Sequence, residues 1–389
     1  MLAKVTESQM HKVRWLLAIG WIGLILSSFY DPISLWLRDP QSLWSPVKVN
    51  LQSCILVQGQ CLPQSSYVLA PRIFWGIVVP VGVIILLVGG HEVWRRICPL
   101  YFISQIPRRL GLQRKKAKTN PETGATRQEL VGIDTESWLG KNYGYLQFFL
   151  LYLGLNIRLL VANGSGTGFG LFVLASIAGA LTVGYLFKGR TWCHYFCPMA
   201  PVQIVYTSNR GLLGTDAHLS PPGSVTQSMC RSGDSGKEKS ACVSCQSPCL
   251  DIDAERTYWA NLEKPERQLL FYGYFGLMLS FFGYFYLYAG NWDYYFSGVW
   301  SHDSQQISSI LGPGFFIQGR SMPIPKLVAV PLTLAFGTLL SYQAGLLLER
   351  LANWYSGVKN LHLSELQVRH LCFVVSVFLS FNVFFIFAG

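Results

Sequence analysis

Seven long apolar runs dominate the pattern of hydrophobic and polar positions along this chain of 389 residues. Each run holds about 18 or more largely apolar residues, the length at which a helix crosses the hydrocarbon core of a bilayer. The pattern therefore predicts an all-α polytopic membrane protein with about seven transmembrane helices. The predicted spans are 13–29, 72–90, 143–161, 168–187, 268–289, 326–348 and 368–388.

Composition and charge agree with this interpretation and give the spans a direction. Hydrophobic residues make up 51% of the chain and charged residues only 13%, unlike the balance of soluble domains. Ten Lys and Arg residues lie between His91 and Asn142, and nine more between Lys188 and Arg267. Because short basic loops stay on the cytoplasmic side, we expect both loops inside a bacterial-type cytoplasmic membrane. The net charge of +11 then reflects contact with anionic membrane lipid, and we expect no nucleic-acid partner.

Spans and loops together divide the sequence into five segments. The outer loop after the first span contains Cys54 and Cys61, which either form a small-loop disulfide or remain free thiols. The segments are 1–90, two spans with that outer loop; 91–142, a basic cytoplasmic loop with a Cys-Pro turn; 143–187, a transmembrane hairpin; 188–267, a cytoplasmic iron-sulfur segment; and 268–389, three further spans.

Seven of the ten cysteines fall in the two cytoplasmic loops. Thiols in a reducing compartment seldom form structural disulfides, so this density indicates metal binding or redox chemistry. We assign no catalytic residue. The predicted cofactor and metal ligands are Cys98, Cys193, Cys197, Cys230, Cys242, Cys245 and Cys249.

The spacing of these cysteines favours an iron-sulfur cluster over zinc. The stretch ACVSCQSPCLDID gives Cys242-x2-Cys245-x3-Cys249, with Cys230 upstream. A 4Fe-4S cluster takes three thiolates from a compact loop and a fourth from elsewhere, often from a Cys-Pro step. A zinc ribbon also uses C-x2-C pairs, but it usually pairs two like knuckles and needs no thiols at helix ends.

Two Cys-Pro steps occur, and they indicate a duplicated unit. Cys98 and Cys197 each precede a proline and each follow a span that runs from outside to inside. WRRICPLYFISQI (94–106) aligns on CHYFCPMAPVQIV (193–205) without a gap. The alignment predicts two copies of a span pair followed by a cysteine-bearing turn, with Trp94 in the position of Cys193.

The stretch 186–255 resembles the polytopic membrane iron-sulfur proteins of the quinol-oxidising type that serve periplasmic nitrate and nitrous-oxide reductases. It also resembles their relatives in cytochrome oxidase maturation, which share a C-x3-C-P turn. The residues that carry the resemblance are WCHYFCP and a ferredoxin-like cysteine-rich loop ending PCLDID. The resemblance implies 4Fe-4S clusters on the cytoplasmic face, membrane electron transfer, and often a quinol as donor.

Departures from the family pattern leave the number of clusters open. The first copy lacks its first cysteine, and Cys249 is followed by Leu250 rather than by proline. Seven thiolates cannot complete two four-thiolate clusters. The chain therefore holds either one cluster with spare thiols, or two with a non-cysteine ligand, for which His91 and His194 are the nearest candidates.

Other side chains are candidate ligands for a second cofactor. His91, His362 and His370 lie near predicted membrane ends, where each either contacts a haem or a quinone headgroup or is solvated. PETGATRQ (121–128) resembles the short T-G-A-T signature at which some respiratory proteins carry a flavin on threonine, here Thr126. No flavin-binding domain surrounds this stretch, so we expect no flavin.

Three functions fit these residues. The first is an electron carrier or oxidoreductase subunit that passes electrons between a quinone/quinol pool or soluble donor and a partner redox protein or complex subunit. The second is a maturation factor that reduces copper for a respiratory oxidase, with Cys372, Met322 and the outer cysteine pair as soft ligands. The third is a non-redox membrane scaffold or transporter with a zinc-bound loop. Charged residues are nearly absent from the spans, which favours the first.

Overall fold

The structure is a computed structural model and describes residues 7–42, 44–45, 48–49, 54–62, 66–119, 126–213, 231–234, 237–240 and 254–388. The chain divides into two compact units, and the boundaries fall inside several of the long helices. The first unit comprises Met1–Trp21, Gly82–Leu151 and Ala175–Arg267. The second unit comprises Ile22–Val81, Tyr152–Leu174 and Gln268–Gly389.

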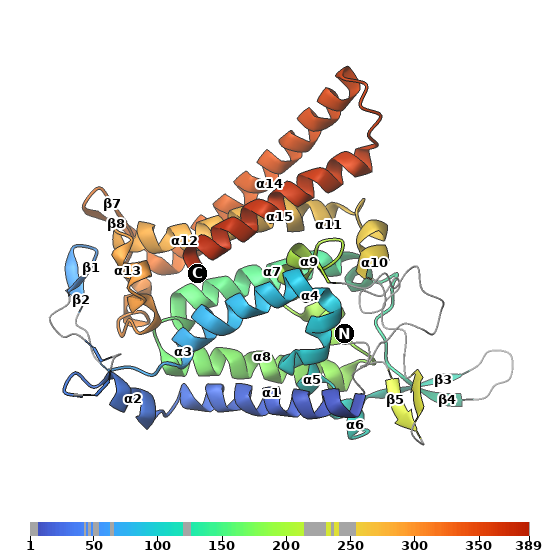
Figure 1. Ribbon diagram of the computed structural model, residues 1–389, viewed down its shortest axis with the longest axis horizontal. Helices are drawn as coiled ribbons and strands as arrows, with labels where there is room; N and C mark the ends of the chain where they lie inside the picture. Colours follow the sequence, from blue (N-terminus) through green and yellow to red (C-terminus); the bar gives the residue numbers. More distant parts are fainter. Residues whose placement is uncertain are drawn as a thin grey trace. The chain divides into compact units, whose positions relative to one another are not determined.

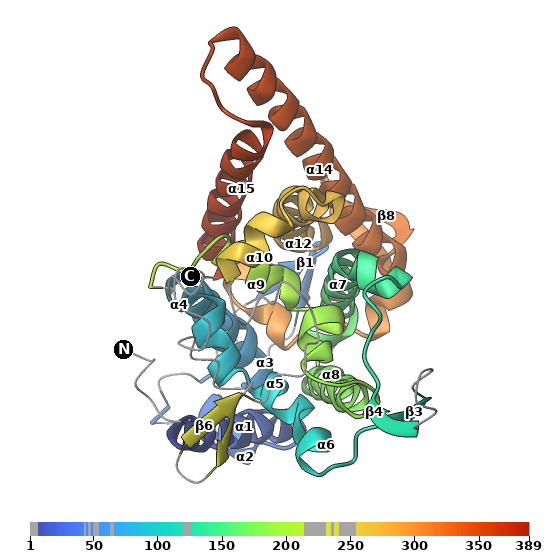
Figure 2. The same cartoon turned by 90° about the vertical axis from the view of Figure 1, so that its right-hand side faces the viewer.

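Helices make up most of the described chain, as Figures 1 and 2 show. The α-helices are α1 (Glu7–Ser27), α2 (Pro32–Arg38), α3 (Ala70–Ile73), α4 (Val79–Ile97), α5 (Pro99–Ser104), α6 (Ile106–Arg109), α7 (Trp138–Ile157), α8 (Gly166–Leu186), α9 (Ala200–Thr207), α10 (Ala254–Ala260), α11 (Pro265–Gln268), α12 (Tyr274–Ala289), α13 (Asp293–Phe296), α14 (Lys326–Val358) and α15 (Glu365–Ala388). Wider π-helical turns form η2 (Phe74–Val78), η3 (Arg158–Ala162), η4 (Trp192–Phe196) and η7 (Leu269–Gly273), and tighter turns form η8 (Val299–Ser301) and η9 (Ser308–Leu311).

Seven of these helical stretches are long and apolar enough to cross a membrane, as predicted. By length and composition the chain is therefore an integral membrane protein. Each stretch overlaps one predicted span, and the ends move by a few residues, except that the sixth runs on to Val358. The seven are Gln9–Ser27, Ala70–His91, Trp138–Ala162, Gly166–Leu186, Pro265–Ala289, Lys326–Val358 and Glu365–Ala388.

Four short antiparallel hairpins lie in the loops of the described chain, and hydropathy alone does not predict them. The first closes over a disulfide between Cys54 and Cys61, whose Cα atoms are 5.4 Å apart. The pairs are β1 (Ile55–Val57) with β2 (Gln60–Leu62), β3 (Lys115–Thr119) with β4 (Thr126–Leu130), β5 (Arg231–Asp234) with β6 (Lys237–Ser240), and β7 (Pro313–Ile317) with β8 (Arg320–Pro325). The strands do not alternate strictly between apolar and polar residues, so a period-two pattern does not reveal them.

Helix α14 extends ten residues beyond the end of the span predicted at 326–348. At the helical rise its 33 residues measure about 50 Å, longer than a hydrocarbon core of about 30 Å. The extra turns are polar and aromatic, so hydropathy alone could not include them. In the second unit α14 and α15 form an antiparallel pair, and α12 packs against both (Figures 1 and 2).

Small residues let α12 and α14 approach closely. A Cβ at Gly276 would collide with the backbone of Gly337, and one at Gly337 would collide with Ser280. Helices in lipid gain no hydrophobic driving force from one another, so close backbone approach through small residues is their main source of packing. The glycines therefore explain why these two spans are paired.

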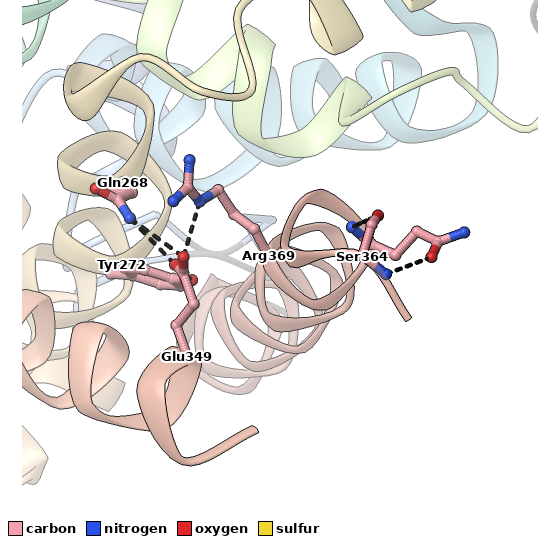
Figure 3. A network of polar contacts seen from close by, with 6 residues as sticks. Gln268, Tyr272, Glu349, Ser364 and Arg369 are labelled. Carbon is pink, nitrogen blue, oxygen red and sulfur yellow. Dashed lines mark hydrogen bonds and ion pairs between the residues drawn. The ribbon is translucent and has the colours of Figure 1, made fainter. Parts of the chain in front are cut away.

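A polar network joins α14, α15 and the start of the fifth span (Figure 3). Glu349 accepts hydrogen bonds from Tyr272 Oη at 2.7 Å and from Gln268 Nε2 at 3.2 Å. Arg369 Nε forms an ion pair with the same carboxylate at 2.8 Å. A buried carboxylate is costly unless it is paired and hydrogen-bonded, and Glu349 meets both conditions.

Candidate metal centre

The first Cys-Pro turn follows a break in α4. Gly90 adopts φ 68° and ψ −172°, a conformation open only to glycine, and the helix resumes until Ile97. Cys98 then turns to φ −58° and ψ 115°, the extended geometry that a following proline imposes. Pro99 begins α5, where its fixed φ and missing N–H suit a first helical position.

The second Cys-Pro turn repeats this geometry. Gly189 has φ 69° and precedes Cys197 by eight residues, the same interval that separates Gly90 from Cys98. Cys197 has φ −66° and ψ 119°, within 10° of the values at Cys98. Helix α9 follows after Pro198. The sequence alignment began only at Trp94, so it missed the paired glycines.

The two copies also exchange hydrogen bonds in a reciprocal way. Leu213 N donates to Val88 O at 2.7 Å, and Arg114 N donates to Tyr185 O at 2.9 Å. Leu213 and Arg114 each lie sixteen residues beyond the cysteine of their own turn. In each copy, the chain that follows the turn packs against the end of the other copy's span. Helix α9 therefore lies beside α4, and α5 lies beside α8 (Figures 1 and 2). The two turns are structural counterparts.

The sulfurs of Cys98 and Cys197 face the backbone N–H groups that follow the proline of each turn. Burial raises the pKa of the Cys98 thiol, while the N–H groups of Tyr101 and Leu100 oppose the rise. Burial, followed by the neighbouring Cys98, raises the pKa of Cys197 to about 12, while the N–H groups two and three residues on again oppose it. Amides directed at sulfur suit a thiolate that binds a metal. Metal binding itself deprotonates such a buried thiol.

The two turns bring three of the predicted ligands into one region of the first unit. Cys197 is buried, while Cys98 and Cys193 are half-buried. Cys193 and Cys197 share an apolar shell with Trp192, Leu100 and other side chains. Thiols are the soft donors that a 4Fe-4S cluster takes, but in this structure these three do not converge into a group that could hold a metal ion.

The other four predicted ligands, Cys230, Cys242, Cys245 and Cys249, lie outside the described residues. Within the described ranges, no group of three or more His, Cys, Asp or Glu side chains could hold a metal ion. Among the described free cysteines, Cys98, Cys193 and Cys197 belong to the Cys-Pro turns and Cys372 does not, so these turns offer three thiols.

Buried cations lie beside the first turn, and the sequence pattern does not single them out. Arg14 is 0% exposed, Arg96 2% and Arg190 4%. The guanidinium of Arg14 donates from Nε to Arg96 O at 2.8 Å, and that of Arg190 lies 3.9 Å from the ring centroid of Tyr101. A four-thiolate iron-sulfur cluster is anionic, so buried positive charge is the complement it requires.

The candidate histidine ligands lie in both units. His91 and His194 are both buried in the first unit, but neither belongs to a metal-holding group within the described ranges. His362 lies exposed between α14 and α15, and His370 lies on α15, both in the second unit. Thr126, the residue considered for a flavin, begins β4, while most of its T-G-A-T stretch lies outside the described residues.

A family model described as a 4Fe-4S binding domain matches residues 71–118 and 169–207. Each matched stretch contains one of the two Cys-Pro turns, and together they include Cys98, Cys193 and Cys197. The match indicates that the chain binds a 4Fe-4S cluster, as predicted. No curated protein and no solved structure matched the chain.

Proposed function

We propose that this chain is a membrane-bound iron-sulfur electron-transfer protein. It relays electrons between a quinone/quinol pool or a soluble donor and a partner redox protein, through one or two 4Fe-4S clusters on the cytoplasmic side. The pair of counterpart Cys-Pro turns, each inside a stretch that matches the 4Fe-4S family, carries the proposal. A cluster beside the ends of membrane spans can exchange electrons with carriers in lipid and in water.

The cytoplasmic assignment rests on charge. Both Cys-Pro turns belong to the two loops that hold nineteen of the 31 Lys and Arg residues. Lys and Arg residues close to the ends of spans keep a loop on the side of synthesis. A reporter fused at Asp234 should therefore report the cytoplasm, and one fused at Ser304 should report the outside.

The copper-reducing alternative has lost part of its support. It relied on Cys54, Cys61, Met322 and Cys372 as soft ligands. The outer pair is closed in a disulfide, which offers no thiolate to a metal. Met322 lies on β8 and Cys372 is buried in α15. The two soft side chains therefore lie on separate elements and do not form one copper site.

The test is the metal content of the anaerobically purified chain. We expect iron and acid-labile sulfide in equal amounts, a brown colour that dithionite bleaches, and a paramagnetic signal in the reduced state. Cys372→Ala, which alters a thiol in the second unit, is the matched control and should retain all three. A colourless protein containing zinc and no labile sulfide would refute the proposal.

A further inference from the structure

A cavity of about 460 Å³ lies beside the second Cys-Pro turn, within the first unit. Its lining includes Tyr143, Tyr195, Lys264, Asn261 and Glu266. Tyr195 belongs to η4 and lies between Cys193 and Cys197 in sequence, so one wall of the cavity is the cysteine turn itself. The volume falls in the range of small-molecule sites.

The carboxyl group of Glu266 is the unusual feature of this cavity. Glu266 is 6% exposed, and its Oε1 has no hydrogen-bond partner among the described residues. Gly144 makes room for it, because a Cβ there would lie 2.9 Å from Glu266 Cγ. Glu349 in the second unit, by contrast, has each of its carboxylate oxygens hydrogen-bonded (Figure 3). A buried, unsatisfied carboxyl beside a cavity is suited to exchange a proton with a bound molecule.

The cavity lies at the level of the membrane surface. Several of its lining residues, among them Tyr143 and Glu266, belong to the first turns of two spans, Trp138–Ala162 and Pro265–Ala289, and others directly precede those spans. Trp138, at the start of the first of these, is 68% exposed, as expected of an interfacial aromatic. A ligand dissolved in the lipid can reach a site at this depth.

The walls of the cavity suit a flat ring that carries hydroxyl groups. The rings of Tyr143 and Tyr195 meet edge to face, with centroids 5.4 Å apart. Lys264 Nζ lies 5.6 Å from the Tyr143 ring centroid, and Asn261 adds an amide. Aromatic walls with a few polar groups orient planar, amphipathic ligands.

We infer that this cavity binds a lipid-soluble hydroquinone and that Glu266 accepts a proton from it. The inference rests on the proposed function and names the binding site of the donor. Oxidation breaks two O–H bonds and yields the quinone, two electrons and two protons. The electrons pass one at a time to the iron-sulfur centre, which the partner redox protein reoxidises. One proton goes to Glu266, and the other to water at the cavity mouth.

The experiment compares two reductants on the purified, iron-loaded full chain. Duroquinol needs the cavity and a proton acceptor, whereas dithionite needs neither. Glu266→Gln keeps the shape of the side chain but removes the acceptor, so cluster reduction by duroquinol should slow about tenfold or more. Iron content and reduction by dithionite should not change. The matched control is Glu129→Gln, because Glu129 is an exposed carboxylate outside the cavity that pairs with Lys118.

Binding gives a readout that does not depend on electron transfer. Duroquinone should bind the full chain in calorimetry, Glu266→Gln should retain that binding, and Tyr143→Ala should weaken it because a ring wall is lost. Equal duroquinol rates in Glu266→Gln and the parent protein would overturn the inference. The inference would also fail if dithionite, but not duroquinol, reduced the cluster of the parent protein. The proposed function would stand in that case. A chain without iron would instead overturn the proposed function.

Discussion

The two Cys-Pro turns share a backbone but differ in chemistry. Both have a left-handed glycine eight residues before an extended cysteine, and both return the chain to the other copy. The second turn, however, holds two thiols, while the first has Trp94 in the position of Cys193. The backbone geometry is thus retained in both copies, while most of the ligand chemistry is concentrated in one.

The indole in the first copy has a packing role. A Cβ at Gly82 would lie 3.3 Å from the Trp94 ring, so the indole packs tightly against the preceding span. In the second copy the ring of Trp192 lies in the same way against Gly179, at 3.5 Å. Both copies therefore anchor the turn with a tryptophan, and only the second has a thiol immediately after it.

The largest expected effect comes from removing the shared cysteine of each turn. Cys197→Ala removes a buried thiolate from the turn that holds two, and the cluster content should collapse because a cluster missing a ligand is exposed and labile. Cys98→Ala should also reduce iron per chain, because the counterpart turns place Cys98 beside Cys197. Iron and labile sulfide measured per chain check both.

Cys98→Ala is the more discriminating of the two substitutions. Unchanged iron and an unchanged reduced-state spectrum would mean that the first copy contributes packing alone. The ligand set would then be confined to residues 193–249. Trp94→Phe is a suitable control in the same copy, because it changes packing against Gly82 without altering a thiol.

The next effect concerns the backbone that the copies share. Gly90→Ala places a side chain at φ 68° and ψ −172°, and its Cβ would lie 3.1 Å from Gly211 N. We expect a loss of about 1–3 kcal/mol from backbone strain, with more from the contact. The thermal midpoint in detergent measures the change. The control is Gly20→Ala in α1, where a Cβ meets nothing within 4 Å. This substitution should leave the thermal midpoint unchanged or raise it. Equal midpoints in both variants would contradict the role given to Gly90.

A smaller effect concerns the charge beside the turns. The sequence positions of Arg190 and His91 correspond, so the second copy has a permanent cation where the first has a histidine. Arg190 is buried and acts electrostatically on Cys98. Its loss in Arg190→Gln should favour the oxidised cluster and move the midpoint potential in the negative direction. A redox titration followed by the paramagnetic signal measures the shift.

An exposed arginine provides the control for that titration. Arg114 lies in the first unit but is exposed to solvent, where charge is screened. Arg114→Gln should therefore leave the midpoint potential close to that of the parent protein. If Arg190→Gln and Arg114→Gln give the same midpoint, the buried guanidinium has no influence on the cluster.

Much of the fold could be predicted from the sequence, because an apolar run of span length is a local property. All seven spans appear, and the alignment of Trp94 with Cys193 anticipated the counterpart turns. The exchange of hydrogen bonds between copies could not be predicted, because residues such as Leu213 and Val88 are far apart in sequence. The sequence gives no sign that Glu266 is buried, because acidic residues are common at the start of a helix. Its burial depends on the space left by Gly144 on another helix.

The smallest effect is expected at a buried thiol that belongs to neither turn. Cys372 lies in α15 of the second unit, is 6% exposed, and lies beside Tyr272 of the fifth span. Cys372→Ala deletes one sulfur from helix packing and should cost about 1 kcal/mol or less. Iron, labile sulfide and the reduced-state spectrum should all match the parent protein. Loss of iron in this variant would place a cluster ligand in the second unit, and the contrast between the two turns would then no longer account for the site.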